Sequence, residues 1–393
     1  MIKYLGSKRR LIALIEAAVL GVSDVNVVVD LFSGTSRVGQ ALKRRGLAVK
    51  ANDHNAYAHT LARCYVEADA DDVTGDATRL IAEMNALPGK AGWFTETYCE
   101  RSRFFQPKNG ARVDVIRDAI AAKGLDPLLE AVLLTSLMEA ADRVDSTVGV
   151  QMAYLKSWAK RANNDLLMRL PELIPAAAKG PCSAHHLDAA DAAAALSGDV
   201  IYLDPPYNVH SYLGNYHIWE TLIAWDRPEV YGIACKRIDV RERKSRFNSR
   251  VQFTDALHGV IARLDARALV VSFSDEGYVT KEQLVALLQT RGPVSVVESS
   301  GFKRYVGAKI GIYSPSGEKV GAVSHTENTE YVFVVTVETP PRRGPAQRPS
   351  QKGGTRAPCD GHSVDSEGIS KMPKPILRNP FSACESAARA RWP

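Results

Sequence analysis

The chain has no long apolar run. Its 393 residues include no stretch of the roughly 18–20 consecutive apolar residues that a membrane-spanning helix requires. The first apolar segment, residues 11–20, is interrupted by Glu16, and no small-residue cleavage pattern follows it. We therefore expect neither membrane insertion nor export, and we expect a cytoplasmic protein.

The sequence also lacks paired cysteines and the spacing of metal ligands. Its six cysteines are scattered and include no CxxC pair, which argues against a disulfide framework and against a zinc ribbon. His185 and His186 are adjacent, so their side chains diverge and joint ligation of a metal is not expected. We predict that the protein uses no metal.

The body of the chain has no net charge, and the excess of basic residues is concentrated at the carboxyl end. Residues 340–393 hold ten lysines and arginines against four aspartates and glutamates, which accounts for the whole net charge of +6. This segment is rich in Pro, Gly and Arg and shows little periodicity. We expect residues 339–393 to form a basic, disordered tail, either a solubilising extension or a non-specific arm for nucleic acid.

What the body does contain is an alternation of strand and helix signals. Residues 25–32, VNVVVDLF, are a continuous β-branched run, as expected for a strand buried on both faces. Between residues 92 and 180 the segments are mostly helical, for example residues 126–144. Further strand signals lie at residues 47–53, 198–204, 266–273, 293–299 and 330–337. This order predicts a doubly wound, Rossmann-like α/β sheet with an inserted helical region.

A glycine turn follows the first of these strands. Gly34 permits a tight turn at the carboxyl end of the strand, where a ligand can approach backbone N–H groups, although such turns are common in α/β proteins. Asp53 ends the second strand, 19 residues beyond Gly34, and a carboxylate there can accept both hydroxyls of a ribose. Because the run is FSGTS and not GxGxxG, an adenosine without a pyrophosphate suits the site better than a dinucleotide.

A second candidate site is the tetrapeptide DPPY, which follows the apolar run VIYL. The exocyclic amine of a nucleobase is a poor nucleophile because its lone pair is delocalised, and two acceptors for its N–H groups would make it reactive. The Asp204 carboxylate can be one acceptor, and the Pro205 carbonyl, fixed by the consecutive prolines, can be the other. Tyr207 offers a face on which the base can stack.

With these motifs the chain resembles the Dam-like adenine-specific DNA methyltransferases, which use S-adenosyl-L-methionine. The resemblance covers most of the chain, up to about residue 337. The family's K-[WY]-x-G-x-K run is similar to KYLGSK here, and its FxGxG turn to FSGTS, with Ser36 in place of the second glycine. The resemblance implies contacts to the methyl donor at Tyr4, Lys8, Phe32, Gly34, Thr35, Asp53 and Asp204.

The resemblance also implies a reaction. DPPY matches fully, which makes Asp204, Pro205, Pro206 and Tyr207 the expected catalytic residues. The sequel YLGNYH, residues 212–217, is similar to a subgroup attached to restriction systems that cut away from their recognition site. We therefore expect transfer of a methyl group to N6 of a flipped-out adenine in double-stranded DNA, in a restriction–modification system. Whether a cognate restriction endonuclease is a partner stays open at this point.

The same resemblance assigns domains. Residues 1–91 would form the donor-binding part of the methyltransferase core, residues 92–180 a helical target-recognition insertion, and residues 181–338 the part with DPPY. Within the insertion, residues 98–112 interleave basic and aromatic side chains, which fits either contacts to DNA or a solvated face with its aromatics turned inward. Residues 236–250 carry seven basic against two acidic residues, which favours contact with a nucleic-acid backbone.

Two alternative functions stay open at this point. An RNA adenine or cytosine-N4 amino methyltransferase would share the chemistry of DPPY. A catalytically inactive DNA-binding module could retain the same fold, although the pairing of KYLGSK, Asp53 and DPPY argues against it. Outside these motifs, Asp188 is expected to cap a helix and not to bind the donor.

Overall fold

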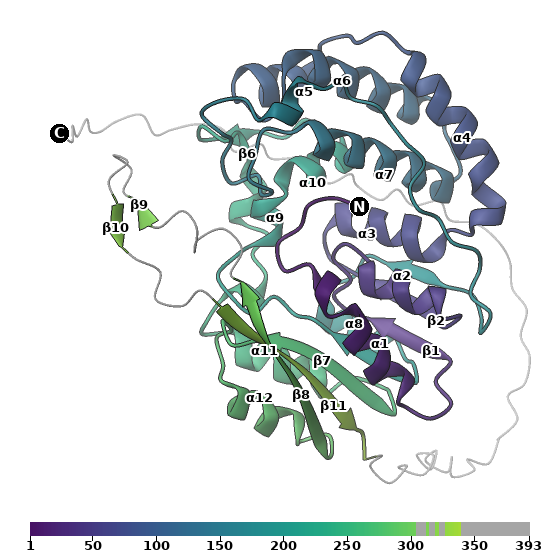
Figure 1. Ribbon diagram of the computed structural model, residues 1–393, viewed down its shortest axis with the longest axis vertical. Coiled ribbons are helices and arrows are strands. Elements are labelled where there is room, and N and C mark those ends of the chain that lie inside the picture. Colours follow the sequence, from purple (N-terminus) through teal and green to yellow (C-terminus); the bar gives the residue numbers. More distant parts are fainter. Residues whose placement is uncertain (304–311, 314–318, 322–326, 339–393) are drawn as a thin grey trace, which may run out of the picture. The chain divides into compact units, whose positions relative to one another are not determined.

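A seven-stranded sheet organises the described part of the chain, which comprises residues 1–303, 312–313, 319–321 and 327–338 of a computed structural model (Figure 1). The strand order is β3-β2-β1-β4-β7-β11-β8, in which the first five strands are parallel and β11 is antiparallel to both of its neighbours. The strands are β1 Val27–Asp30, β2 Ala48–Asn52, β3 Ser183–His185, β4 Val200–Leu203, β7 Ala268–Ser274, β8 Val294–Lys303 and β11 Glu327–Thr336. The expected doubly wound α/β fold is confirmed.

The direction of strand addition reverses between β1 and β4. From β1 the chain adds β2 and β3 on one side, whereas β4 and β7 lie on the other. Asp30, the last residue of β1, is in register with Ala51 and Tyr202, so the three strands end at the same edge. In open α/β sheets the crevice at such a reversal is where ligands bind.

Helices cover both faces of the sheet. The helices described are α1 Ile12–Leu20, α2 Arg37–Arg44, α3 Ala56–Ala62, α4 Ala70–Ala86, α5 Trp93–Thr95, α6 Pro107–Ala122, α7 Pro127–Val144, α8 Ala189–Ala195, α9 Tyr212–Asn215, α10 His217–Ala224, α11 Phe253–Ile261 and α12 Lys281–Leu288. One core joins α1 and α2 to the sheet through residues such as Ile15 and Val28. A second core joins α8, α11 and α12 to the opposite face through residues such as Leu257 and Ile201. Because strand residues alternate between these cores, the β-branched runs are buried on both sides.

A third core belongs to the helical region. It contains buried residues of α4, α6 and α7 together with residues of α3 and α10, and these helices gather in the upper part of the view (Figure 1). Residues 92–180 are thus largely helical, but they share their core with helices from outside that range. Whether they act as a target-recognition unit stays a prediction.

Two short antiparallel hairpins have no counterpart in the sequence-based predictions. One pairs β5 Val230–Tyr231 with β6 Lys236–Arg237, and the other pairs β9 Ile312–Tyr313 with β10 Lys319–Gly321. Across the described residues, every helix is too short or too polar to cross a lipid bilayer. The basic tail expected at residues 339–393 lies outside the described residues.

Candidate active site

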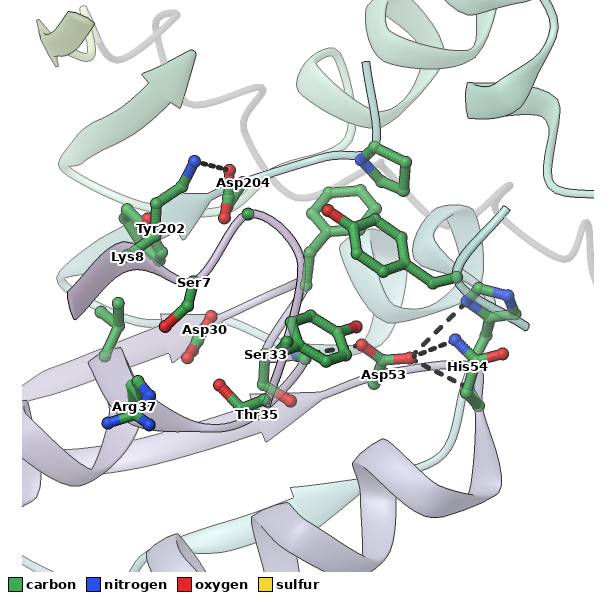
Figure 2. Close-up of a pocket in the computed structure, with 18 residues that line it drawn as sticks. Ser7, Lys8, Asp30, Ser33, Thr35, Arg37, Asp53, His54, Tyr202 and Asp204 are labelled. Atoms are coloured by element: carbon green, nitrogen blue, oxygen red, sulfur yellow. Dashed lines mark hydrogen bonds and ion pairs between the residues drawn. The ribbon is translucent and has the colours of Figure 1, made fainter. Parts of the chain in front are cut away.

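A pocket opens to solvent at the sheet edge where β1, β2 and β4 end (Figure 2). The sequence-predicted residues that line it are Tyr4, Lys8, Phe32, Gly34, Thr35, Asp53, Asp204 and Pro206. Pro205 and Tyr207 belong to the same turn but do not line the cavity. The structure therefore brings the two sequence motifs into one pocket, while the role of each residue remains a prediction.

The turn after β1 adopts the conformation that a glycine pair would favour. Gly34 has φ +51°, and Ser36 has φ +59°, which is unusual for a residue with a side chain. A Cβ on Gly34 would come within 3.4 Å of the Tyr4 ring, so a larger residue would crowd the turn against the amino-terminal segment. Ser36 therefore departs from the family pattern in residue type but keeps the backbone shape.

Asp53 closes the opposite end of the pocket, directly after β2. One carboxylate oxygen accepts the Gly34 N–H at 3.0 Å, and the other accepts the Asn55 N–H at 2.9 Å. The His54 ring lies 3.7 Å from the second oxygen. The carboxylate is thus held in one orientation in the cavity and keeps lone pairs for hydroxyl donors of a ligand.

Asp204 is held in a buried ion pair. Its Oδ1 lies 3.0 Å from the Lys8 ammonium and accepts the Ser272 hydroxyl at 3.1 Å, while Glu330 lies 3.7 Å from the same ammonium. Burial raises the pKa of Asp204, and Lys8 and Ser272 oppose that rise. Burial alone would lower the pKa of Lys8, but Asp204, Tyr207 and Glu330 raise it well above its usual range. Lys8 is therefore a cation that favours the ionised form of Asp204.

The DPPY turn is fixed by its aromatic residue. The Tyr207 ring lies 4.9 Å from the Phe273 ring, centroid to centroid, and its carbonyl accepts the Tyr278 N–H at 3.0 Å. The Lys8 ammonium lies 5.5 Å from the centre of the Tyr207 ring. Burial is the largest influence on the Tyr207 phenol and raises its pKa. Tyr207 therefore borders the place where Asp204 meets Lys8.

The amino-terminal segment is clamped by the residues that follow DPPY. The Tyr4 ring lies between Tyr212 and Tyr216, at centroid distances of 5.1 and 4.6 Å, and is nearly parallel to both rings. The Tyr216 hydroxyl accepts the Leu5 N–H at 2.6 Å. The KYLGSK run and the YLGNYH run, which are far apart in the sequence, thus form one wall of the pocket.

Three further lining residues were not singled out from the sequence. Asp30, at the end of β1, is buried, and neither carboxylate oxygen has a hydrogen-bond partner. Ser33 Oγ and Arg37 Nε are also buried without partners. Burial, followed by Asp204, raises the pKa of Asp30 to about 8. The only sequence signal for Asp30 was its position at the end of the strand VVVD. An acidic residue there is equally consistent with an ordinary strand end.

These unpartnered groups indicate what the pocket can hold. Buried polar groups normally have partners, so a carboxyl, a hydroxyl and a guanidinium left without them point to a polar ligand. An amino-acid moiety would supply an ammonium for Asp30 and a carboxylate for Arg37, while a ribose would reach Asp53. The polar side chains that line the pocket therefore fit an adenosine joined to an amino acid.

In residues 98–112, which could either contact DNA or form a solvated face with buried aromatics, the aromatic side chains point into the protein. Tyr98, Phe104 and Phe105 are fully buried in the core of the helical region. Arg112 donates to backbone carbonyls at the end of α4, and Lys108 pairs with Asp165 at 2.5 Å. The alternative with the aromatics turned inward is the correct one. Asp188 caps α8, also as expected, by accepting the Ala190 N–H at 2.9 Å.

Metal ligands are not clustered in the part of the chain that the structure describes, where no three His, Cys, Asp or Glu side chains are arranged to hold an ion. His185 contacts Ser183, and His186 contacts the His54 carbonyl. That the protein uses no metal stays a prediction.

Comparison with known proteins was made against family models and curated sequences. Residues 4–287 match the model of the D12 class N6 adenine-specific DNA methyltransferases. The type II methyltransferase M.NlaIII of Neisseria lactamica is 28% identical over 77% of this chain and 92% of that protein. The type II methyltransferase M.FokI of Planomicrobium okeanokoites is 29% identical over 74% of this chain, and the modification methylase StsI of Streptococcus sanguinis is 26% identical over 73%. The matches span only 47% and 46% of those two larger proteins.

Proposed function

The chain belongs to the D12 class of N6 adenine-specific DNA methyltransferases, and from that premise we propose that it extrudes an adenine from duplex DNA and methylates it in the pocket beside Asp204. The observation that carries this proposal is the meeting of Asp53, Lys8 and Asp204 in one cavity. A match to an adenine-specific DNA class favours adenine over the cytosine and RNA alternatives.

Methyltransferases of this family use S-adenosylmethionine, which supplies a methyl group on a positively charged sulfur. In our proposal Asp53 binds the ribose of S-adenosylmethionine. Phe32, Gly34 and Thr35 line the side of the pocket along which the cofactor lies, and Tyr4 covers the cofactor. Arg37 and Asp30 bind the amino-acid end. At the amino-acid end this assignment uses the Asp30 carboxyl oxygens and Arg37 Nε, which lack partners within the protein.

Asp204 and the Pro205 carbonyl accept the two N–H groups of the target amine. This orients the nitrogen lone pair away from the ring and stabilises the positive charge that develops on nitrogen. Tyr207 stacks on the base, and Pro206 fixes the turn between them. After methyl transfer the nitrogen loses a proton, and the Asp204 carboxylate is an acceptor in contact with it.

In the same proposal, the target amine replaces the Lys8 ammonium at the Asp204 carboxylate. Its ammonium occupies Asp204 Oδ1, the oxygen that the target amine needs, and Glu330 offers a second carboxylate 3.7 Å away. We infer that Lys8 moves toward Glu330 when the base arrives. Until then Lys8 neutralises a buried charge that would otherwise be costly.

The biological setting that we propose is restriction–modification, in which the chain protects a recognition sequence from a cognate endonuclease. The names of the relatives, type II methyltransferase and modification methylase, support this setting. Complete methylation of one short sequence in a host that carries the gene would be the expected signature.

Digestion of methylated DNA to nucleosides tests the reaction. Plasmid DNA incubated with the protein and S-adenosylmethionine should yield N6-methyladenine, and the Asp204→Ala variant should yield none while still binding the donor. Sequencing that reports modified bases then locates the recognition sequence. Appearance of N4-methylcytosine in place of N6-methyladenine would refute the proposal.

A further inference from the structure

The β5–β6 hairpin presents an isoleucine to solvent. Ile233, in the turn between the strands, is 78% exposed. The turn is tight, because Gly232 has φ +69°, Cys235 has φ +45°, and the Cys235 N–H donates to the Gly232 carbonyl at 3.1 Å. Single exposed aliphatic residues are common, so exposure alone would mean little.

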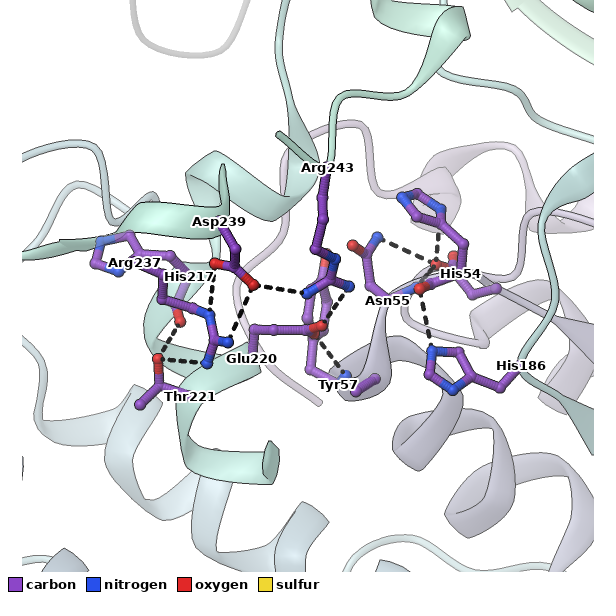
Figure 3. Close-up of polar contacts among 12 residues, drawn as sticks. His54, Asn55, Tyr57, His186, His217, Glu220, Thr221, Arg237, Asp239 and Arg243 are labelled. Atoms are coloured by element: carbon purple, nitrogen blue, oxygen red, sulfur yellow. Dashed lines mark hydrogen bonds and ion pairs between the residues drawn. The ribbon is translucent and has the colours of Figure 1, made fainter. Parts of the chain in front are cut away.

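The hairpin is fastened to the protein at its base. Arg237, in β6, is only 4% exposed and donates to both carboxylate oxygens of Asp226 at 2.8 and 2.7 Å. It also donates to Asp239 at 3.0 Å and to the Thr221 hydroxyl at 3.3 Å (Figure 3). A bidentate pair between a buried guanidinium and a carboxylate at the surface fixes orientation. The tip is therefore carried on a rigid support.

A second contact extends this support toward the donor pocket. Arg243 donates to Glu220 Oε1 at 2.8 Å, and Glu220 Oε2 accepts the Tyr57 N–H at 3.2 Å, at the start of α3 (Figure 3). Glu220 is buried in α10. Helix α3 follows Asp53 in the chain, so the segment after the hairpin is joined to the ribose end of the pocket.

Contacts also place the hairpin next to the rim of the pocket. The Lys236 ammonium lies 3.2 Å from the Met152 sulfur, and Met152 is half exposed. The preceding residue, Gln151, donates its N–H to the Asn215 carbonyl at 2.7 Å. Asn215 ends α9, whose first residue, Tyr212, lines the pocket.

The surroundings of the tip are cationic. Arg241 and Lys244 are exposed, and the Arg241 guanidinium lies 3.9 Å from the centre of the Tyr231 ring on the hairpin. An apolar tip with cations at its base matches the duplex, which presents stacked bases between phosphates. Extruding a base leaves a gap in that stack and costs a few kcal/mol.

We propose that Ile233 inserts into the base stack beside the extruded adenine and fills the space that the base leaves, with Met152 next to it. This inference rests on the proposed function. Ile233 forms no hydrogen bond and contacts no reacting atom, so it is a positioning residue. It stabilises the extruded state and leaves the methyl-transfer step itself unchanged.

The experiment compares two duplexes that carry the recognition sequence identified by modified-base sequencing. In one the target adenine is paired with thymine, and in the other it faces an abasic site, so that little pairing opposes extrusion. We compare kcat and KM for the wild type, Ile233→Ala and Ile233→Leu. Leu20→Ala is the matched control, since Leu20 is an exposed aliphatic residue, 45% exposed, at the end of α1.

Ile233→Ala should lose roughly tenfold or more in kcat/KM on the paired duplex, because extrusion is no longer compensated. On the abasic duplex the loss in kcat/KM should shrink to about threefold or less, because extrusion costs less there and Ile233 has less of that cost to offset. Ile233→Leu should retain most of the activity, and Leu20→Ala should match the wild type. With 2-aminopurine as the target base, Ile233→Ala should show a smaller rise in fluorescence on binding.

Equal losses on both duplexes would make the tip a simple docking contact and would overturn the proposal, as would no loss on either duplex. A change in oligomeric state of Ile233→Ala without DNA would assign the tip to contact between copies of the chain and would also overturn it. If the wild type itself methylates no adenine, the proposed function fails first. That failure is distinct from one confined to Ile233.

Discussion

Two buried aspartates show how differently the sheet edge and the helical region are built. Asp30 at the end of β1 is 1% exposed and Asp114 in α6 is 4% exposed. Asp114 accepts the N–H groups of Gly92, Phe94 and Thr95 and the Thr95 hydroxyl, at 2.6 to 3.0 Å. The Asp30 oxygens have no hydrogen-bond partner.

The difference separates stability from binding. Asp114 holds the start of α5 against α6, and its charge is fully compensated by donors of the protein. Asp30 lies in the donor pocket, where its groups gain partners only when a ligand supplies them. We therefore expect loss of an acid at the sheet edge to change catalysis or binding, and loss of the acid in the helical region to change the free energy of unfolding alone.

The strongest test of this contrast is Asp204→Asn. The variant keeps the shape of the side chain but loses the charge that stabilises developing positive charge on the target nitrogen, so kcat should fall by roughly 10²–10³-fold. Donor binding by calorimetry should change little, while the melting temperature should fall because the buried Lys8 ammonium loses a charged partner. A kcat near that of the wild type would remove Asp204 from the mechanism.

The converse test is Asp114→Ala. Three backbone N–H groups and a hydroxyl lose their acceptor in a buried place, so the free energy of unfolding should fall by about 3 kcal/mol. Urea denaturation measures this loss. Methylation per folded molecule should remain near the wild-type level at low temperature. A large fall in kcat without a loss of stability would contradict the division between the two regions.

Asp30→Asn should stabilise the protein, and the gain should depend on pH. The pKa of Asp30 is raised to about 8 in the folded state, above its ordinary 3.8. The unfolded chain therefore ionises at lower pH than the folded one, and wild-type stability falls as pH rises from 3.8 to 8. Asparagine mimics the neutral acid, so its advantage should grow across that window by about 1.4 kcal/mol for each pKa unit of the shift.

The same variant should weaken donor binding, because asparagine cannot pair with an ammonium. Thermal melting across pH 4–9, with and without S-adenosylhomocysteine, checks both effects. A stability difference that is constant with pH would show that the Asp30 carboxyl does not titrate as described.

The smallest effect is expected at Ser36. Its φ of +59° costs energy for a residue with a side chain, and glycine relieves that cost. Ser36→Gly should raise the free energy of unfolding by roughly 0.5–1 kcal/mol, after allowance for the greater freedom of glycine in the unfolded chain. Donor affinity should stay the same, because the turn keeps its shape. A loss of affinity would mean that the serine hydroxyl matters to the ligand.

Much of the sheet could be predicted from the sequence because its parallel strands are buried on both faces. The run at residues 25–32 contains β1 Val27–Asp30, and the helix expected at residues 126–144 corresponds to α7 Pro127–Val144, which Asp126 caps. The β5–β6 hairpin could not be predicted, since two-residue strands have no measurable period. Its position depends on the bidentate pair of the buried Arg237 with Asp226 at the surface.

The site was predictable where a motif fixes local shape and not where it depends on tertiary contact. Gly34, Asp53 and Asp204 follow strand ends, so their convergence at one edge could be expected. The ion pair of Lys8 with Asp204 joins segments far apart in the sequence, and no local pattern specifies it. Asp30 was missed because the sequence does not reveal which buried groups lack partners.

The two basic stretches show the same limit. In residues 98–112 the aromatic side chains fill a core, Arg112 binds carbonyls and Lys108 binds a carboxylate. In residues 236–250, Arg237 and Arg243 are engaged in internal ion pairs, while Arg241 and Lys244 face solvent. The two stretches have a similar composition, but residues 98–112 serve packing and residues 236–250 expose charge. The difference depends on which groups each side chain contacts in the folded protein.

The Glu220 carboxylate, shared by Arg243 and the start of α3, has a practical consequence for redesign. A chimera that borrows residues 226–250 from a relative to alter sequence preference would import a foreign partner for Glu220. The graft should therefore begin before α10, so that Glu220 and the segment that contains its partner Arg243 are transferred together. A shorter graft would leave an acid stranded beside the ribose end and could disable the recipient enzyme even if its new target were read correctly.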